Sequence, residues 1–223
     1  MEMKMEICRE DLINLVNLQL NNLLGSSGNV KNYVDTTLER LSKCFKLTKD
    51  KYYRSSNNCK FSPYHSGQYS IFLYYLANTI HREAGDSELS TKLYYLNKIM
   101  NSVDWYYEIA LPEYFGVEHP MGSVLGRARY SDGFYIFQGC TVGGDKGTNP
   151  NYPQIGKNVI MYSNSTVLGE VNIGKNVIIS TGTTIINENI PDGCIVFGHS
   201  PNLLIKEKSL SEINKHISEF WLI

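Results

Sequence analysis

The chain has 223 residues, 42% of them hydrophobic, and its 21 basic residues nearly balance its 22 acidic residues. A chain of this length and composition can bury a sizeable core, and its near-neutral charge predicts neither a nucleic-acid interface nor a membrane-surface patch. No apolar run approaches the roughly 20 residues of a membrane-spanning helix. The charged N-terminus also lacks the apolar region of a signal peptide.

The cysteines argue against disulfides and against a zinc site. There are five of them, an odd number, and none stands in a CxxC spacing. This pattern favours neither a disulfide framework nor a zinc ribbon. We therefore expect a cytoplasmic protein that holds no metal.

Residues 1–103 are expected to form a helical N-terminal domain, because apolar residues recur there at the spacing of one helical face. The predicted helices are, in chain order, 12–20, 34–45, 68–82 and 90–102. Residues 50–66 carry the serine, asparagine and proline of a connection, and they are predicted to connect two of these helices.

The second half of the chain repeats every six residues. The repeated apolar position is occupied by Ile155, Met161, Val167, Ile173, Ile179 and Ile185, and upstream by Val124, Tyr130, Ile136 and Val142. The fifth position of each repeat is mostly small or β-branched. This period fits neither a helix nor an alternating strand. It is typical of a triangular coil in which about three repeats complete one turn and the apolar position points inward.

The predicted fold class is therefore α+β, a helical N-terminal domain followed by a parallel β-helix over residues 104–207. The repeat slips by one residue after Val142, so residues 143–154 are predicted to leave the coil as a loop. A β-helix needs both ends covered. We expect the N-terminal helices to cover one end and residues 191–207 to close the other, with residues 208–223 as a helical tail.

Two further motifs accompany the repeat. Residues 118–122 read Glu-His-Pro-Met-Gly, and residues 138–144 read Gln-Gly-Cys-Thr-Val-Gly-Gly. With the helical half and the Gly-His-Ser-Pro segment at 198–201, they resemble the serine O-acetyltransferase branch of the hexapeptide-repeat acyltransferases, over residues 60–207. The resemblance implies a left-handed β-helix and an acetyl-CoA-dependent O-acetyltransferase, with L-serine slightly ahead of a sugar as the acceptor.

The resemblance also assigns the catalytic pair. The family's catalytic histidine falls on His119, which would remove the proton of the acceptor hydroxyl as that oxygen attacks the thioester. An alcohol is a poor nucleophile at neutral pH, so the step needs a positioned base. The family's aspartate partner, fifteen residues earlier, falls on Asp104. There it would fix the histidine tautomer and stabilise the imidazolium.

In the family, acetyl-CoA lies in a groove between subunits of a trimer and is held largely by backbone groups. The matching positions are Gly143, Gly144, Ser163 and Thr181. The two glycines let backbone N–H groups approach a carbonyl oxygen closely. Lys206 is a candidate contact for a nucleotide phosphate, with a solvated surface lysine as the alternative. The expected assembly is a homotrimer or a dimer of trimers.

The acceptor side departs from the family. The Arg-His pair that grips the serine carboxylate is replaced by Asn151 and Tyr152, and neither supplies a bidentate cation. The residue before the catalytic histidine is Glu118 instead of aspartate, and His65 is a further candidate for the acceptor site. The candidates for a substitute cation are Arg127, Arg129 and Lys146. Without one, the acceptor is a sugar or nucleotide-linked amino sugar, whose hydroxyl needs no such clamp.

Other interpretations stay open. A catalytically inactive trimeric β-helix would explain the loss of the Arg-His pair. A zinc-dependent carbonic anhydrase on this fold needs three converging histidines, but residues 104–207 contain only His119 and His199. The family often ends in an isoleucine that binds the next enzyme of cysteine synthesis, and this chain ends in Ile223. Packing of the tail on its own protein is the alternative explanation.

Overall fold

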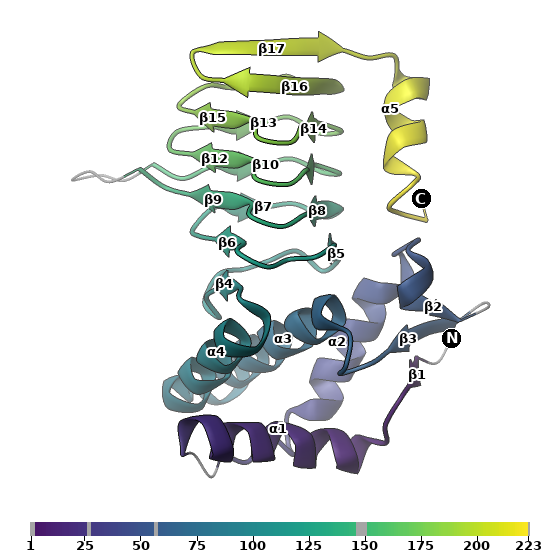
Figure 1. Ribbon diagram of the computed structural model, residues 1–223, viewed down its shortest axis with the longest axis vertical. Helices are drawn as coiled ribbons and strands as arrows, with labels where there is room; N and C mark the ends of the chain where they lie inside the picture. The colour runs from purple at the N-terminus through teal and green to yellow at the C-terminus, as the bar shows by residue number, and fades with distance from the viewer. Residues whose placement is uncertain (1–2, 26–27, 56–57, 146–150, 223) are drawn as a thin grey trace.

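The computed structural model describes residues 3–25, 28–55, 58–145 and 151–222. A helical domain and a β-helix stack end to end, and the C-terminal helix runs alongside the β-helix back toward the helical domain (Figure 1). This arrangement confirms the predicted fold class.

The predicted helices all form. The four helices of the helical domain are somewhat longer than expected, whereas the C-terminal helix is shorter. They are α1 (Arg9–Leu24), α2 (Val34–Lys46), α3 (Ser66–Ala84), α4 (Ser87–Asn101) and α5 (Leu210–Ile217). Gly85, in the left-handed conformation, ends α3, and the Asp86 side chain caps the N-terminus of α4 by accepting a hydrogen bond from Leu89 N–H. The turn between α3 and α4 is therefore only two residues long.

Short elements of secondary structure form within the connection over 50–66. This segment contains the 3-10 helix η1 (Lys51–Tyr53) and the strands β2 (Arg54–Ser55) and β3 (Asn58–Phe61), and β3 also pairs with β1 (Lys4–Met5). Cys59 and Phe61 are buried, but two apolar positions are too few for a periodic pattern to emerge from the sequence.

The β-helix is built from strands of two or three residues, followed by a longer terminal hairpin. The strands are β4 (Asp104–Trp105), β5 (Phe115–Val117), β6 (Val124–Leu125), β7 (Arg129–Tyr130), β8 (Phe134–Ile136), β9 (Thr141–Gly143), β10 (Gln154–Ile155), β11 (Ile160–Met161), β12 (Thr166–Leu168), β13 (Asn172–Ile173), β14 (Ile178–Ile179), β15 (Thr184–Ile186), β16 (Cys194–His199) and β17 (Asn202–Glu207). All pairs from β4 to β16 are parallel, and only β16 and β17 pair antiparallel.

Three faces enclose the core. The first face stacks β4, β6, β9, β12 and β15, the second stacks β7, β10 and β13, and the third stacks β5, β8, β11 and β14. Along the first face the inward residues are Trp105, Leu125, Val142, Val167 and Ile185, each no more than 1% exposed. Each apolar residue thus packs on its equivalent one coil away, as the six-residue period predicts.

Val124 is the exception to the predicted inward positions. It is 38% exposed, and its neighbour Leu125, 1% exposed, pairs with Val142 and points inward instead. Only five residues separate Leu125 from the next inward residue, Tyr130. The register shifts here because the preceding corner is longer than the corners stacked on it.

The corners require a left-handed backbone, and glycine and asparagine supply it. Positive φ angles occur at Gly133, Gly139, Gly169, Gly182, Asn158, Asn164, Asn176 and Asn187. Glycine adopts this conformation without a steric penalty, and asparagine tolerates it better than most residues. Their spacing in the sequence therefore marks the corners as clearly as the apolar residues mark the sides.

Both ends of the β-helix are covered as predicted. The β16–β17 hairpin closes the last coil. The helical domain closes the first coil, where Tyr74 Oη donates to Ile109 O at 2.6 Å and Asn78 Nδ2 donates to Tyr107 O at 2.7 Å.

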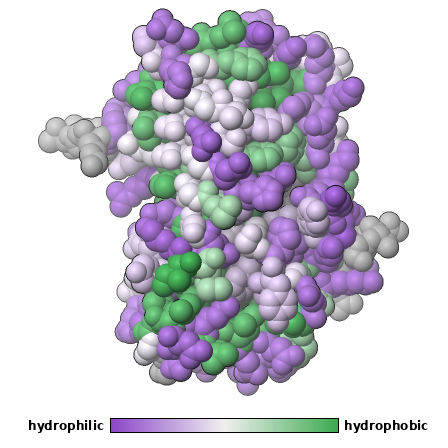
Figure 2. Space-filling view, in the orientation of Figure 1, coloured by the Kyte–Doolittle hydropathy of each residue, from purple (hydrophilic) through white to green (hydrophobic). Residues whose placement is uncertain are grey.

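Of the predicted loop 143–154, residues 146–150 lie outside the described part of the chain. None of the described helices is long and apolar enough to cross a membrane. Figure 2 shows hydrophobic and hydrophilic residues interspersed on one side of the molecule.

The C-terminal tail packs on its own chain. Helix α5 lies against the third face, where Ile213 and Ile217 contact Ile160 and Ile178. Beyond the helix, Trp221 is 1% exposed, and its indole N–H donates to Gly133 O at 3.0 Å. The tail therefore joins the β-helix to the helical domain, since its last residues also pair with residues 47–49.

Candidate active site

The corner between β5 and β6 is longer than the corner stacked on it. The inward-pointing Val117 and Leu125 are eight positions apart, whereas Ile136 and Val142 in the next coil are six positions apart. The additional residues belong to the Glu-His-Pro-Met-Gly motif of residues 118–122. The motif therefore forms an enlarged turn close to the helical domain.

His119 lies in this turn with an exposed side chain and a left-handed backbone, at φ 49°. The described corners above it place asparagine or glycine at positive φ. A strained backbone of this kind costs about 1–3 kcal/mol and is often found at functional sites. Among the described residues, none forms a hydrogen bond with the imidazole. The ring is thus free to exchange a proton with a substrate.

Ser163 and Thr181 lie in corners that stack on the His119 turn. We call these corners, which lead from the third face to the first face, the His119 column. The register of β5, β8, β11 and β14 aligns Val117, Ile136, Met161 and Ile179. Two positions further along the chain, Gln138, Ser163 and Thr181 are therefore stacked one coil apart. Ser163 Oγ donates to Thr181 Oγ1 at 3.4 Å. Two of the residues predicted for acetyl-CoA thus share a column with the predicted base.

Gln138 is a residue of this column that sequence reasoning quoted within a motif but did not single out. Its Oε1 is buried and has no hydrogen-bond partner among the described residues. A buried acceptor without a partner calls for an explanation, and one lying between His119 and Ser163 fits a ligand N–H donor. No sequence signal distinguishes such an orphaned amide from one that is satisfied.

Lys206 lies on the terminal hairpin. Strand β16 aligns Val196 with Ile179, and β17 pairs Lys206 with Ile195, at the end of the third face. Lys206 is exposed, with its Nζ 5.3 Å from the centroid of the Phe197 ring. Its position suits either a phosphate contact at the end of a long ligand or the solvated lysine of the alternative.

Asp104 forms other contacts in this structure than the predicted one. Its carboxylate accepts hydrogen bonds from Tyr94 Oη and Lys98 Nζ, both at 2.6 Å, and among the described residues no hydrogen bond joins it to His119. Burial works to raise the pKa of Asp104, but the bonds from Lys98 and Tyr94 outweigh it and hold that pKa below the ordinary value. Asp104 is therefore an ionised carboxylate at neutral pH, and its role toward His119 stays a prediction.

His65 lies beside the His119 turn. His65 Cε1 and Val117 Cγ2 both lie 3.4 Å from the point that a Cβ on Gly67 would occupy. Burial lowers the pKa of His65, and its neighbours Lys60 and His119 lower that pKa further, against the opposing effect of Asp50. His65 is therefore neutral at pH 7 and near the predicted base.

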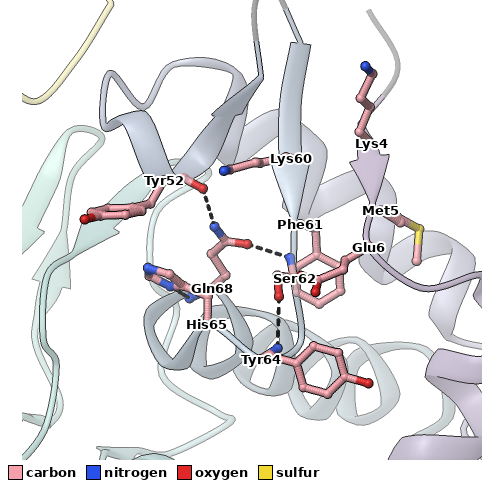
Figure 3. A pocket seen from close by; sticks show the side chains of 10 residues that line it. All are labelled: Lys4, Met5, Glu6, Tyr52, Lys60, Phe61, Ser62, Tyr64, His65 and Gln68. Carbon is pink, nitrogen blue, oxygen red and sulfur yellow. Dashed lines mark hydrogen bonds between the residues drawn. The ribbon is translucent and has the colours of Figure 1, made fainter.

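A cavity of about 360 Å³ opens on the helical-domain side of His65. Figure 3 shows its lining, which combines the aromatic Tyr52 and Tyr64 with the charged Lys4, Glu6 and Lys60. The buried Gln68 side chain holds two segments of this lining together, because its amide donates to Tyr52 O and accepts from Ser62 N–H, both at 2.7 Å.

The remaining predicted residues lie at a different corner. Gly143 ends β9, and the loop returns at Asn151 and Tyr152, where Asn151 N–H donates to Asp145 Oδ1 at 2.8 Å. Gly144 has no room for a side chain, since an added Cβ would meet the Tyr152 ring at 2.6 Å. Within one chain, the structure does not bring this corner to the His119 column.

Of the candidate cations, Arg127 and Arg129 lie away from the His119 turn, just before β7 and on it. A hydrogen bond and charge from Tyr152 raise the pKa of Arg127, which places its guanidinium at the loop corner. Arg129 is exposed on the second face, and Lys146 lies outside the described residues. In the described part of the chain, no group of three His, Cys, Asp or Glu side chains is placed to hold a metal ion.

Comparison with known proteins places the chain near one family. No family model matches it. A curated protein of Schizosaccharomyces pombe (strain 972 / ATCC 24843), named "Putative serine acetyltransferase", is 26% identical over 175 residues, which cover 74% of this chain. The match spans only 64% of that relative's own length.

Solved structures of serine acetyltransferases share the fold. The enzyme of Neisseria gonorrhoeae has a TM-score of 0.66 at 20% identity, covering 92% of this chain and 83% of its own. The enzyme of Vibrio cholerae O1 biovar El Tor N16961 has a TM-score of 0.67 at 20% identity, covering 87% and 80%. The chain is thus similar in sequence to a serine acetyltransferase relative and has the helical domain and left-handed β-helix of solved serine acetyltransferases.

Proposed function

We propose that the protein is an acetyl-CoA-dependent serine O-acetyltransferase with His119 as its general base. The observation that carries the proposal is His119 itself, an exposed histidine at positive φ in the enlarged corner. The similarity to serine acetyltransferases supports it, and one of these, from Neisseria gonorrhoeae, has been solved in complex with serine. We place the reaction in the cytoplasm, in keeping with five unpaired cysteines.

The chemistry follows from the column of corners. The His119 imidazole takes the proton of the acceptor hydroxyl while that oxygen bonds to the thioester carbonyl carbon. The tetrahedral intermediate then collapses, the C–S bond breaks, and the thiolate takes the proton back from the imidazolium. Small side chains at Ser163 and Thr181 leave the backbone of the column open to the long acyl donor, and Gln138 Oε1 offers an acceptor that is still without a partner.

The proposed active unit is a homotrimer. Within one chain, the His119 column and the Gly143–Gly144 corner lie apart, and a three-fold assembly would bring one chain's column against a neighbour's loop corner. Gly143 and Gly144 can then serve the donor carbonyl, as the family resemblance implies. A dimer of trimers and a partner enzyme of cysteine synthesis belong to the same proposal as finer expectations.

The test replaces His119 with asparagine. His119→Asn removes the base but retains a residue that tolerates positive φ, so the fold is expected to be at least as stable. We expect thiol release from acetyl-CoA with L-serine to fall by at least about 100-fold, with no decrease in the melting temperature.

The control is Asn164→Gly, which changes a corner residue of the same conformation without touching the base. It should retain the wild-type rate. Full activity in His119→Asn would refute the proposed base. Thiol release by the wild-type protein with amino sugars and not with serine would retain the mechanism but change the acceptor.

A further inference from the structure

The cavity beside His65 contains an ammonium group that the fold itself does not use. Lys60 lies on β3 and is half-buried, and in the described part of the chain it forms neither a salt bridge nor a side-chain hydrogen bond. Figure 3 shows its side chain extending to the side of the cavity where Tyr52 and His65 lie, whereas Lys4 extends away from them. Desolvating an ammonium is unfavourable unless an anion accompanies it, so the position invites an anionic ligand.

His65 supplies a neutral donor on the same wall. Its Nδ1 accepts the Gln68 N–H at 3.3 Å, so the neutral ring carries its proton on Nε2. Its ring is flanked by the rings of Tyr52 and Tyr53, with centroids 5.8 and 5.6 Å away. The cap and the two rings fix the imidazole, and its remaining N–H is left for a ligand.

Lys60 and His65 together offer the cation and the N–H donor for a carboxylate, and the corner with Asn151 and Tyr152 lacks the cation. A carboxylate is held most firmly by one cation together with one N–H donor, and Asn151 and Tyr152 supply no cation. Lys60 and His65 come from the helical domain instead, and His65 packs at Gly67 beside Val117, which precedes the turn that carries His119. Glu6, on the β1 side of the same cavity, adds a negative group for an ammonium ion.

We propose that Lys60 and His65 form the carboxylate clamp for the acceptor, which is therefore an α-amino acid and not a sugar. The inference rests on the proposed function for its reaction, but the clamp is a binding site that can be tested without turnover. The acceptor carboxylate bonds to Lys60 Nζ and His65 Nε2–H, and its hydroxyl faces His119.

The experiment titrates L-serine and L-serinamide, which lacks the carboxylate, into the full-length protein by calorimetry. Lys60→Met removes the ammonium but retains the alkyl stem. We expect it to weaken L-serine binding about 10- to 100-fold and to leave L-serinamide binding unchanged. Lys60→Arg, which keeps the cation, should bind L-serine within a few-fold of the wild-type protein. Lys157→Met, an exposed lysine of the β-helix, is the matched control.

Equal L-serine affinity in Lys60→Met and wild-type protein would overturn the clamp, and so would wild-type protein that binds L-serinamide as tightly as L-serine or binds no L-serine. Thiol release with acetyl-CoA, measured in parallel, separates the two proposals. Binding of L-serine that depends on Lys60, without thiol release, would refute the proposed acetyltransferase activity but support the clamp. Thiol release from serine that is unchanged in Lys60→Met would refute the clamp while the acetyltransferase stands.

Discussion

At the scale of single residues, His65 combines a structural and a chemical role. It caps α3 through Nδ1, and burial lowers its pKa from the ordinary value near 6.5. The folded protein therefore binds a proton at His65 less readily than the unfolded chain does. In the window just below pH 6.5 the unfolded state holds more protons, so stability is lost as the pH falls through it.

We predict that His65→Asn removes this pH-dependent contribution to the free energy of unfolding. Asparagine is a good N-cap, so the free energy of unfolding at about pH 7.5 should change little. Between about pH 7.5 and pH 5.5 the wild-type protein should lose more stability than the variant. Urea unfolding of both proteins at the two pH values measures this difference, and parallel losses would show that His65 titrates normally.

At the scale of elements, the C-terminal tail links the two domains. Leu222 N–H donates to Leu47 O at 2.8 Å and Lys49 N–H donates to Phe220 O at 2.9 Å, so the tail pairs with the segment that follows α2. Trp221 packs against Tyr114 and Tyr135, with ring centroids 5.2 and 5.7 Å away. A partner enzyme that bound these residues would first have to break this pairing.

Trp221→Ala should therefore destabilise the protein by about 3–5 kcal/mol, the usual cost of truncating a buried large aromatic side chain. Leu222→Ala is the matched control, because Leu222 is 43% exposed and should cost no more than about 0.5 kcal/mol. Denaturant unfolding compares the two. Similar small losses would mean that the tail is detached in solution, as the expected contact with a partner enzyme requires.

At the scale of the whole molecule, the three faces of the β-helix differ in what covers them. The third face is covered by α5. The second presents exposed polar residues such as Arg129, Gln154 and Asn172. From β6 to β15, the outward residues of the first face are uncharged, namely Val124, Thr141, Thr166, Leu168, Thr184 and Ile186. An uncharged face of this kind is the expected subunit interface.

We predict that Ile186→Glu, which places a charge on the β15 end of this face, dissociates the proposed trimer. Burying an unpaired carboxylate at an interface is strongly unfavourable, whereas Asn172→Glu on the second face should leave the assembly intact. Light scattering coupled to size-exclusion chromatography measures the mass of each variant. A trimer that survives Ile186→Glu would place the interface on another face.

The sequence alone determined the elements whose pattern is local. A six-residue apolar period has few structural solutions other than a triangular coil. The four helices of the first domain were predictable for the same reason, since each carries several turns of one apolar face.

Which residues contact one another depends on how the strands and the two domains pack in the folded protein. Leu125 displaces Val124 because a two-residue strand takes its register from the strands stacked on it, and not from its own sequence. His65 lies beside Val117, at the start of the His119 turn, although more than fifty residues separate the two. Trp221 reaches Gly133 across 88 residues. Such contacts depend on how the two domains pack together, and no local pattern encodes that packing.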